Sequence, residues 1–116
     1  MEKNVYRGEI YFANLSGAIG SEQKGFRPVV IVQNNVGNNY SPTVIAVPLT
    51  KICTSIDTQP THIEIEKFNL LKYDSTILAE QIRTLDKSRL GDKIGQLPFY
   101  IMKKLDKGML IAQGLH

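Results

Sequence analysis

The chain has 116 residues, of which 42% are hydrophobic and 22% charged. These values fit one folded domain spanning residues 1–116 and exclude a disordered protein. No apolar run approaches the roughly 18 residues that cross a bilayer, and the N-terminus lacks the basic and then apolar pattern of a secretory signal, so we expect a cytoplasmic protein. The net charge of +3 permits a polyanionic partner without requiring one.

Most familiar enzyme and metal motifs are absent from the sequence. There is no G-x-S-x-G elbow, Walker loop, Rossmann glycine pattern or H-E-x-x-H, which excludes several classes of enzyme. The single cysteine, Cys53, cannot form an internal disulfide and is interpreted as an incidental thiol rather than a nucleophile. His62, Glu64 and Glu66 have the two-residue spacing of one strand face, but we interpret them as a solvated face and predict no metal.

Short strands separated by turn residues are expected in the first two-thirds of the chain. Alternation of apolar and polar residues indicates two of them, and a β-branched run after Pro28 is typical of a central strand in which the proline stands at the start. Isolated from its neighbours, Leu78–Gln81 also tolerates a helix, and the β-rich context decides for a strand. The expected strands are Glu9–Ala13, Pro28–Gln33, Thr43–Thr50, Thr61–Glu66 and Ser75–Thr84.

Two of the connections are rich in turn residues. Leu15–Phe26 contains three glycines and no consistent period, and a connection of that length in a small domain is usually functional. Val36–Pro42 is a second turn-rich segment that we expect to be a loop.

A helix is expected after Pro98, which suits the first turn of a helix. Gly108 weakens its middle, and Gly114 can end it. Apolar residues recur at helical spacing in this segment: Phe99, Met102, Leu105, Met109 and Ala112. About five short antiparallel strands cannot pair all their edges in a flat sheet, so we expect an α+β fold, a small, partly open SH3-like barrel with the helix packed across one side.

Three polar positions are candidates for chemistry. Arg27 follows a polar, glycine-flanked loop, and its guanidinium offers a permanently charged fork for phosphate oxygens; the alternative is an arginine at the barrel mouth paired with Glu22 or another carboxylate. Thr50 offers a hydroxyl at a strand end, where threonine is also common for structural reasons. In Glu80–Thr84, alternation sends Gln81 and Arg83 to one face, where a hydrogen-bond ladder is the alternative to a functional role.

Taken in order, these segments resemble the MazF/PemK toxins of bacterial toxin–antitoxin pairs. The matching residues are Gly20–Gln23 with Arg27–Val30, then Ser41–Thr50, then Glu80–Thr84. The resemblance extends from Arg7–Ala13 into the expected C-terminal helix, and is strongest to MazF homologues of low-GC Gram-positive bacteria, which carry the GSEQ, RP and EQIRT elements at this spacing.

The resemblance implies the toxin of a type II system with a CcdB/PemK-like fold. It implies a homodimeric, metal-independent and cofactor-free endoribonuclease that cuts single-stranded mRNA, not DNA, at a short sequence without the ribosome and so inhibits translation and growth. A cognate MazE-type antitoxin is the implied inhibitor. The family's catalytic positions fall on Arg27 and Thr50, and positions near the RNA path fall on Ser21, Glu22, Gln23 and Gln81.

The chemistry of such a cut suggests a role for each of the two catalytic positions. Attack of a ribose 2′-OH on phosphorus builds negative charge, which Arg27 would stabilise while Thr50 orients the proton at the reacting oxygen. The products are a 2′,3′-cyclic or 3′-phosphate and a 5′-hydroxyl. The sequence identifies no general base: neither His62 nor His116 belongs to the motif, and Glu22 ranks behind the two catalytic positions.

Other residues are candidates for reading bases, and two other functions compete with cleavage. Unpaired bases are read by edge hydrogen bonds and stacking, for which the candidates are Gln23, Glu80, Gln81, Phe26 and Tyr40, with barrel core as the alternative for Phe26. A gyrase poison of the CcdB type is one rival, although the chain has no tryptophan where that type has a terminal one. A non-catalytic RNA-binding module is the other.

Overall fold

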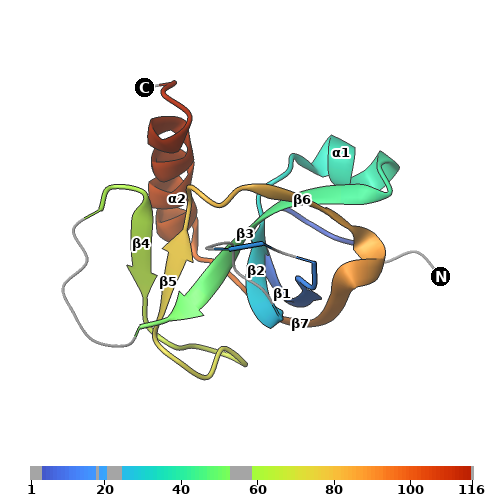
Figure 1. Cartoon of the computed structure of the whole chain (residues 1–116), viewed down its shortest axis with the longest axis horizontal. Helices are drawn as coiled ribbons and strands as arrows, with labels where there is room; N and C mark the ends of the chain where they lie inside the picture. The colour runs from blue at the N-terminus through green and yellow to red at the C-terminus, as the bar shows by residue number, and fades with distance from the viewer. Residues whose placement is uncertain (1–3, 18, 21–24, 53–58, 116) are drawn as a thin grey trace.

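The computed structural model describes residues 4–17, 19–20, 25–52 and 59–115, and Figure 1 shows the whole chain. In this part of the chain, strands alternate with two α-helices and one 3₁₀-helix. The elements are β1 (Glu9–Asn14), β2 (Phe26–Ile31), α1 (Asn35–Tyr40), β3 (Thr43–Lys51), β4 (His62–Ile65), β5 (Ser75–Leu78), β6 (Arg83–Asp86), the 3₁₀-helix η1 (Lys87–Arg89), β7 (Leu90–Gln96) and α2 (Phe99–Ala112).

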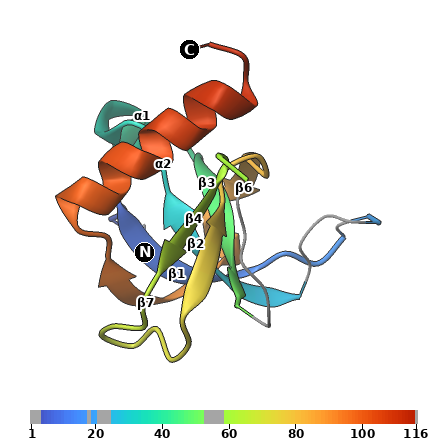
Figure 2. The same cartoon turned by 90° about the vertical axis from the view of Figure 1, so that its left-hand side faces the viewer.

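All the strand pairs are antiparallel, and β3 belongs to two sheets. The strand order is β4-β5-β3-β2-β1-β7, with β6 also pairing with β3. The first half of β3 pairs with β2 and β6, and its last residues pair with β5. Because β6 leads through η1 into β7, which pairs with β1, these strands form the small barrel that the sequence predicts, with α2 lying across the β4–β5 side (Figures 1 and 2).

Two separate cores follow from the two faces of the strands. The barrel interior is filled by Val5, Tyr11, Ala13, Leu15, Val29, Ile31, Val44, Ala46, Leu85 and Leu90. The space between the sheets and α2 is filled by side chains of the opposite parity, among them Ile10, Val30, Val47, Leu49, Ile63, Ile77, Ile101, Met102 and Leu105. Since β1, β2 and β3 send side chains into both cores, they are buried on both faces over most of their length.

The start of β2 differs from the expectation. Pro28 lies in the third position of the strand rather than at its start, because Phe26 and Arg27 already pair with β1. On the other edge of β2, the ladder to β3 begins only at Val29. The missing N–H of Pro28 therefore interrupts no ladder on the β3 side.

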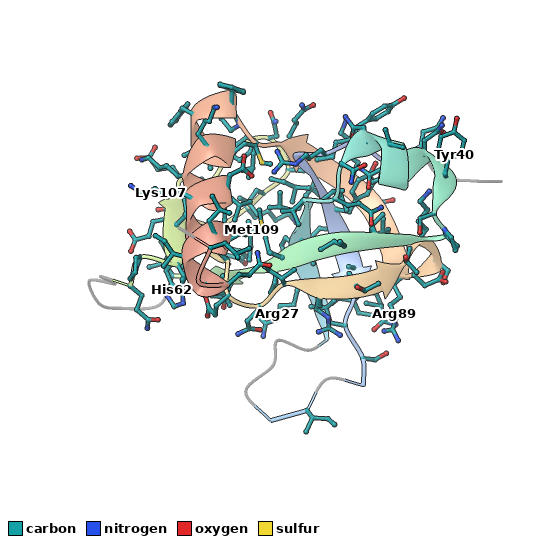
Figure 3. All side chains as sticks on the ribbon, turned by 90° about the horizontal axis from the view of Figure 1, so that it is seen from above. Arg27, Tyr40, His62, Arg89, Lys107 and Met109 are labelled. Carbon is teal, nitrogen blue, oxygen red and sulfur yellow. The ribbon has the colours of Figure 1, made fainter. Side chains whose placement is uncertain are left out.

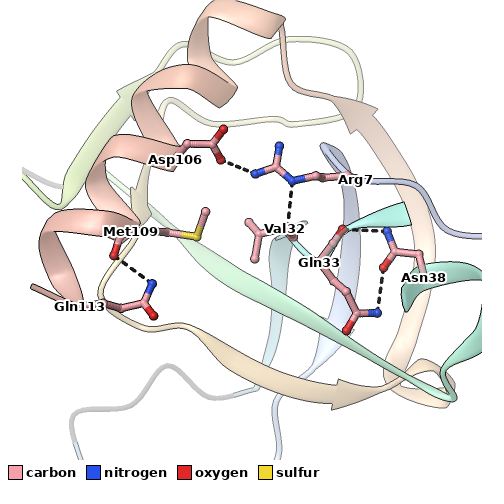
Figure 4. Close-up of polar contacts among 7 residues, drawn as sticks. All are labelled: Arg7, Val32, Gln33, Asn38, Asp106, Met109 and Gln113. Atoms are coloured by element: carbon pink, nitrogen blue, oxygen red, sulfur yellow. Dashed lines mark hydrogen bonds and ion pairs between the residues drawn. The ribbon is translucent and has the colours of Figure 1, made fainter. Parts of the chain in front are cut away.

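The expected loop at Val36–Pro42 contains a short helix instead. The side chain of Asn34 caps α1 by accepting a hydrogen bond of 2.8 Å from the Gly37 amide. The Asn38 side chain is buried and exchanges hydrogen bonds of 3.0 and 3.1 Å with the main chain and side chain of Gln33 (Figure 4). Neither an apolar period nor good helix formers mark this segment, because polar tertiary contacts hold it.

The expected strand Ser75–Thr84 is two strands. β5 ends at Leu78, and the chain leaves β3 through Ala79–Ile82 before β6 begins at Arg83. Opposite this excursion β3 passes only Val47 and Pro48. Alternation across Glu80–Thr84 was therefore the wrong interpretation, since its first residues are not in a strand.

Strand β7 was not predicted at all. Only Leu90 and Ile94 are buried among its residues, and Gly91 and Gly95 replace side chains that would mark alternation. The register with β1 also shifts twice along this strand. A strand that is bulged and exposed on most positions carries little periodic signal.

Helix α2 follows the prediction at both ends but not along its whole face. Pro98 caps its N-terminus, and Gly114 ends it at a φ of 73°. Phe99 and Ala112 are exposed, so they do not belong to the buried face as expected. That face consists of Ile101, Met102, Leu105 and Gly108.

Gly108 has a packing role that the sequence did not indicate. A Cβ at this position would lie 3.1 Å from Cδ1 of Ile63 and 3.2 Å from Cβ of Ala79. The glycine therefore allows α2 to approach β4 closely, which offsets its low helix propensity. No helix in the described part of the chain is long and apolar enough to cross a membrane.

Candidate functional site at the barrel rim

The two catalytic candidates lie on opposite sides of a fork between β2 and β3. The ladder between these strands ends at the pair Val29–Pro48. Beyond that pair β3 continues with β5, where Thr50 lies opposite Thr76. Extending the β2–β3 register by two residues leads to Arg27 on one side of the fork and Thr50 on the other.

Both residues lie on the face of the strands that lines the barrel. Arg27 is the register partner of Ala13 and follows the parity of Val29, and both of these neighbours are in the barrel core. Thr50 follows the parity of Ala46, another residue of that core. Side chains two residues apart on a strand share a face, so Arg27 and Thr50, both half-buried, lie at the rim where the apolar interior ends.

A further arginine is directed to the same face. Arg83, the first residue of β6, pairs with Ala46, so it also has the parity of the barrel interior, and it is half-buried. Gln81 lies two residues earlier, in the segment between β5 and β6. Its main-chain N–H donates a hydrogen bond of 3.0 Å to the Leu78 carbonyl. Gln81 and Arg83 thus enter the rim from a turn and a strand, not from the single ladder considered above.

The connection between β1 and β2 leaves from the same rim. Its base is closed by a hydrogen bond of 2.9 Å from the Leu15 amide to the Gly25 carbonyl, and Gly25 has a φ of 80° that favours glycine. Figure 3 shows Arg27 and Arg89 on the side from which this connection leaves. Ser21, Glu22 and Gln23 lie outside the described residues.

The aromatic candidates separate in space. Phe26 directly precedes Arg27 and is 75% exposed, so barrel core was the wrong alternative for it. Tyr40 is also exposed, but it belongs to α1, away from the side of Arg27 in Figure 3. Of these two rings, only that of Phe26 is near the fork.

The histidine and carboxylate candidates do not form a metal site. Nε2 of His62 forms a hydrogen bond of 3.0 Å with the Glu80 carboxylate, and the His62 side chain is only 12% exposed. Glu64 and Glu66 are exposed, as expected for a solvated face. Among the described residues no group of three His, Cys, Asp or Glu side chains is arranged to hold a metal; Cys53 lies outside them.

The rim combines cationic donors with a hydroxyl. Guanidinium groups bind phosphate oxygens with paired hydrogen bonds. Because Arg27 and Arg83 lie on the two sides of β3, they could bind two different phosphates of one polyanionic chain. Sequence reasoning missed Thr76 as a member of this face, and it grouped Arg83 with Gln81 without linking either to Arg27 and Thr50. The registers of Thr76 and Arg83 with β3 could not be known in advance, although Arg83 belongs to the same matched motif as Gln81.

Comparisons with known proteins identify the family of this chain. Residues 6–112 match the family described as PemK-like, MazF-like toxin of type II toxin-antitoxin system. The chain is 51% identical over 111 residues to Endoribonuclease MazF of Staphylococcus saprophyticus, covering 95% of this chain and 92% of the relative. A mycobacterial endoribonuclease solved in complex with its cognate antitoxin is 30% identical, with a TM-score of 0.78 and 97% of each chain covered.

A more distant structure supports the fold alone. MazF from Deinococcus radiodurans superimposes with a TM-score of 0.82 at 20% identity, covering 97% of this chain and 99% of the other. The barrel with its C-terminal helix is therefore retained where most of the sequence has changed.

Proposed function

This chain belongs to the PemK-like, MazF-like toxins of type II toxin–antitoxin systems, and we propose that it is a sequence-specific endoribonuclease that cuts single-stranded mRNA without a metal. Arg27 and Thr50 are the proposed catalytic residues. Cleavage of mRNA in the cytoplasm would stop translation and growth.

The observation that carries this proposal is the position of Arg27 and Thr50 on the two sides of the fork. A phosphodiester between them would meet a guanidinium from β2 and a hydroxyl from β3. Because both residues are on strands of the barrel, their positions are held before the substrate arrives. Arg83 is on the same face and would bind a neighbouring phosphate.

The proposed reaction is an internal transesterification. The ribose 2′-oxygen attacks the adjacent phosphorus, the bond to the 5′-oxygen breaks, and a 2′,3′-cyclic phosphate and a 5′-hydroxyl result; water then opens the cyclic ester to a 3′-phosphate. Arg27 donates hydrogen bonds to the non-bridging oxygens as their charge increases. Thr50 orients the 2′-hydroxyl or the phosphate oxygen by its own hydroxyl.

Recognition of the RNA sequence is assigned to groups around the rim. Gln81 offers an amide for a base edge, and Ser21, Glu22 and Gln23 of the β1–β2 connection are proposed to contact the RNA. The exposed ring of Phe26 beside Arg27 is suited to stacking on an unpaired base.

We infer that the active form is a homodimer inhibited by a cognate MazE-type antitoxin. The support for an antitoxin is the similar mycobacterial endoribonuclease, which was solved in complex with one. A net charge of +3 favours an acidic partner that folds when it binds.

The test is incubation of the purified protein with a long single-stranded RNA in excess EDTA. We expect discrete cuts at one recurring short sequence, mapped by primer extension, with cyclic or 3′-phosphate and 5′-hydroxyl ends. Intact RNA from a folded sample would contradict the proposal and favour the gyrase-poison or binding-module alternatives. Cuts that require magnesium would contradict the metal-independent chemistry.

A matched substrate isolates the nucleophile. An oligonucleotide with one 2′-deoxy substitution at the mapped site should bind as the all-ribose strand does but resist cleavage, because the attacking hydroxyl is missing. Efficient cleavage of this substrate would exclude 2′-OH attack.

A further inference from the structure

Arg89 connects η1 to the end of β1. One nitrogen of its guanidinium, Nη1, donates hydrogen bonds of 3.0 Å to the Asn14 carbonyl and 3.1 Å to the Ser16 carbonyl. These two carbonyls belong to the last residue of β1 and to the first part of the connection that follows. Arg89 therefore holds the main chain at the point where the β1–β2 connection begins (Figure 3).

The segment that Arg89 holds is the support of Arg27. Asn14 is the register partner of Phe26, and Leu15 donates to the Gly25 carbonyl, so β1 fixes the residues immediately before Arg27. On its other edge this part of β2 has no ladder with β3 in the described chain, since that ladder ends at Val29. The ladder that contains Arg27 is therefore the one with β1.

At its C-terminal end, β1 extends beyond its ladder with β7. Its pairing with β7 ends at Ala13 and Leu90, and Arg89 immediately precedes Leu90. The two hydrogen bonds from Arg89 extend that contact past the end of the ladder to Asn14 and Ser16.

The short helix η1, which carries Arg89, is held by a cap at its start and by contacts of Lys87. Asp86 caps it by accepting a hydrogen bond of 2.9 Å from the Ser88 amide. Lys87 attaches it to α1 and to the residue before β3, because its main-chain amide donates to the Pro42 carbonyl at 3.0 Å and its Nζ donates to the Asn38 carbonyl at 2.5 Å. The hydrogen bonds from Ser88, with a smaller effect of the Arg89 charge, hold the pKa of the Asp86 carboxyl below its usual range, so this cap keeps its negative charge at neutral pH.

We propose that Arg89 is a positioning residue that sets the place of Arg27 at the fork by holding the Asn14–Ser16 carbonyls, and that it does not bind the RNA itself. The inference rests on the proposed function, because its consequence is measured as cleavage. A displacement of a catalytic group by about 1 Å is sufficient to reduce a rate by up to 10²-fold. Loss of the two hydrogen bonds should therefore reduce kcat although Arg89 touches no substrate.

The test compares Arg89→Ala with Lys87→Ala, which removes a side-chain hydrogen bond from the same 3₁₀-helix on the side of α1. The substrate is a short RNA that spans a site mapped with the unchanged protein. We expect kcat of Arg89→Ala to fall about 10- to 100-fold, whereas Lys87→Ala retains a normal kcat even if its unfolding midpoint is lowered. Normal kcat in Arg89→Ala would overturn the inference, as would an equal loss in Lys87→Ala.

A binding measurement separates positioning from direct contact with phosphate. Affinity for the 2′-deoxy form of the same RNA is measured at several salt concentrations by fluorescence anisotropy. Positioning predicts an unchanged salt dependence, while loss of a phosphate contact would reduce the slope of log K against log salt by about 1. Arg89→Lys sharpens the result: it keeps the positive charge that a phosphate contact would need, but its shorter side chain ends before the position of Nη1, which donates to both carbonyls.

The proposed function and this inference fail in different ways. If the unchanged protein leaves RNA intact, the proposed function is wrong. If it cleaves and Arg89→Ala cleaves equally well, or if the salt slope changes without a change in kcat, only the positioning role is wrong.

Discussion

The two ends of β2 are held very differently. Its C-terminal end pairs with β3 through Val29–Ile31, and Val29 and Val30 pair with β1 as well. Among the described strands, the N-terminal end, at Phe26–Pro28, forms a ladder only with β1. The proposed catalytic arginine is on the end with fewer partners.

Polar contacts increase the contrast. Just beyond the C-terminal end, the Arg7 guanidinium donates to the Val32 carbonyl at 3.0 Å and forms an ion pair with Asp106 of α2 (Figure 4). The Arg7 amide donates to the Asn35 side chain at 2.7 Å. One end of the strand is thus tied to both helices, while the other keeps an open edge from which side chains can meet a substrate.

Arg27→Ala gives the largest expected effect: it should reduce activity at the N-terminal end of β2 without reducing stability. We expect kcat for RNA cleavage to fall on the order of 10²–10³-fold, because one preorganised donor to the developing charge is lost. The unfolding midpoint in denaturant should change little, since the strand at this position is held by its main chain. Arg27→Lys controls for charge: it keeps the cation without the fork and should remain well below normal activity. Near-normal cleavage by the alanine variant would refute the assignment.

Asn38→Ala is the opposite case: it changes the contacts of α1 with Gln33, just beyond the C-terminal end of β2, and should reduce stability rather than activity. Its buried amide exchanges hydrogen bonds with Gln33, and removing it takes one hydrogen bond from the Gln33 carbonyl and one from Nε2, which keeps its bond to the Thr43 carbonyl. We expect a loss of about 1–3 kcal/mol in the free energy of unfolding, measured by denaturant titration. RNA cleavage well below the unfolding transition should remain normal. A large loss of activity without a loss of stability would show that the two ends are coupled.

The sequence was sufficient to predict the barrel because apolar and β-branched runs determine most of its strands. The runs at Glu9–Ala13, Thr43–Thr50 and Thr61–Glu66 match β1, β3 and β4 within one residue at each end. The failures share a cause. Helix α1 and strand β7 bury few side chains, so they depend on hydrogen bonds to distant residues and not on a local apolar period.

The candidate site was predictable only in part. Motif resemblance selected Arg27 and Thr50, but their common face follows from the β2–β3 register, which no local pattern gives. Arg89 was not selected at all, because its role depends on two main-chain carbonyls more than 70 residues earlier in the chain. Contacts of this kind leave no spacing that a sequence pattern can reveal.

The smallest expected effect concerns Tyr11 of β1, which pairs with Val29 in the half of β2 that is also paired with β3. Burial raises the pKa of Tyr11 first, and its hydrogen bond to Glu9 and the charge of that carboxylate raise it further. A folded-state pKa above the unfolded value contributes stability that is present below pH 10 and is lost as the pH rises beyond it. Tyr11→Phe should therefore cost about 1 kcal/mol at pH 8 and lose less stability than the unchanged protein between pH 9 and pH 11.

The measurement is the denaturant midpoint of both proteins across that range. Glu9 also forms an ion pair of 2.6 Å with Lys93, and both proteins contain both of these residues, so the difference between the two proteins reports on Tyr11. Equal alkaline losses would show that the Tyr11 hydroxyl does not resist ionisation in the fold. Cleavage at pH 8 should be the same in both, because Tyr11 belongs to the end of the barrel that holds the strands and not to the end that carries Arg27.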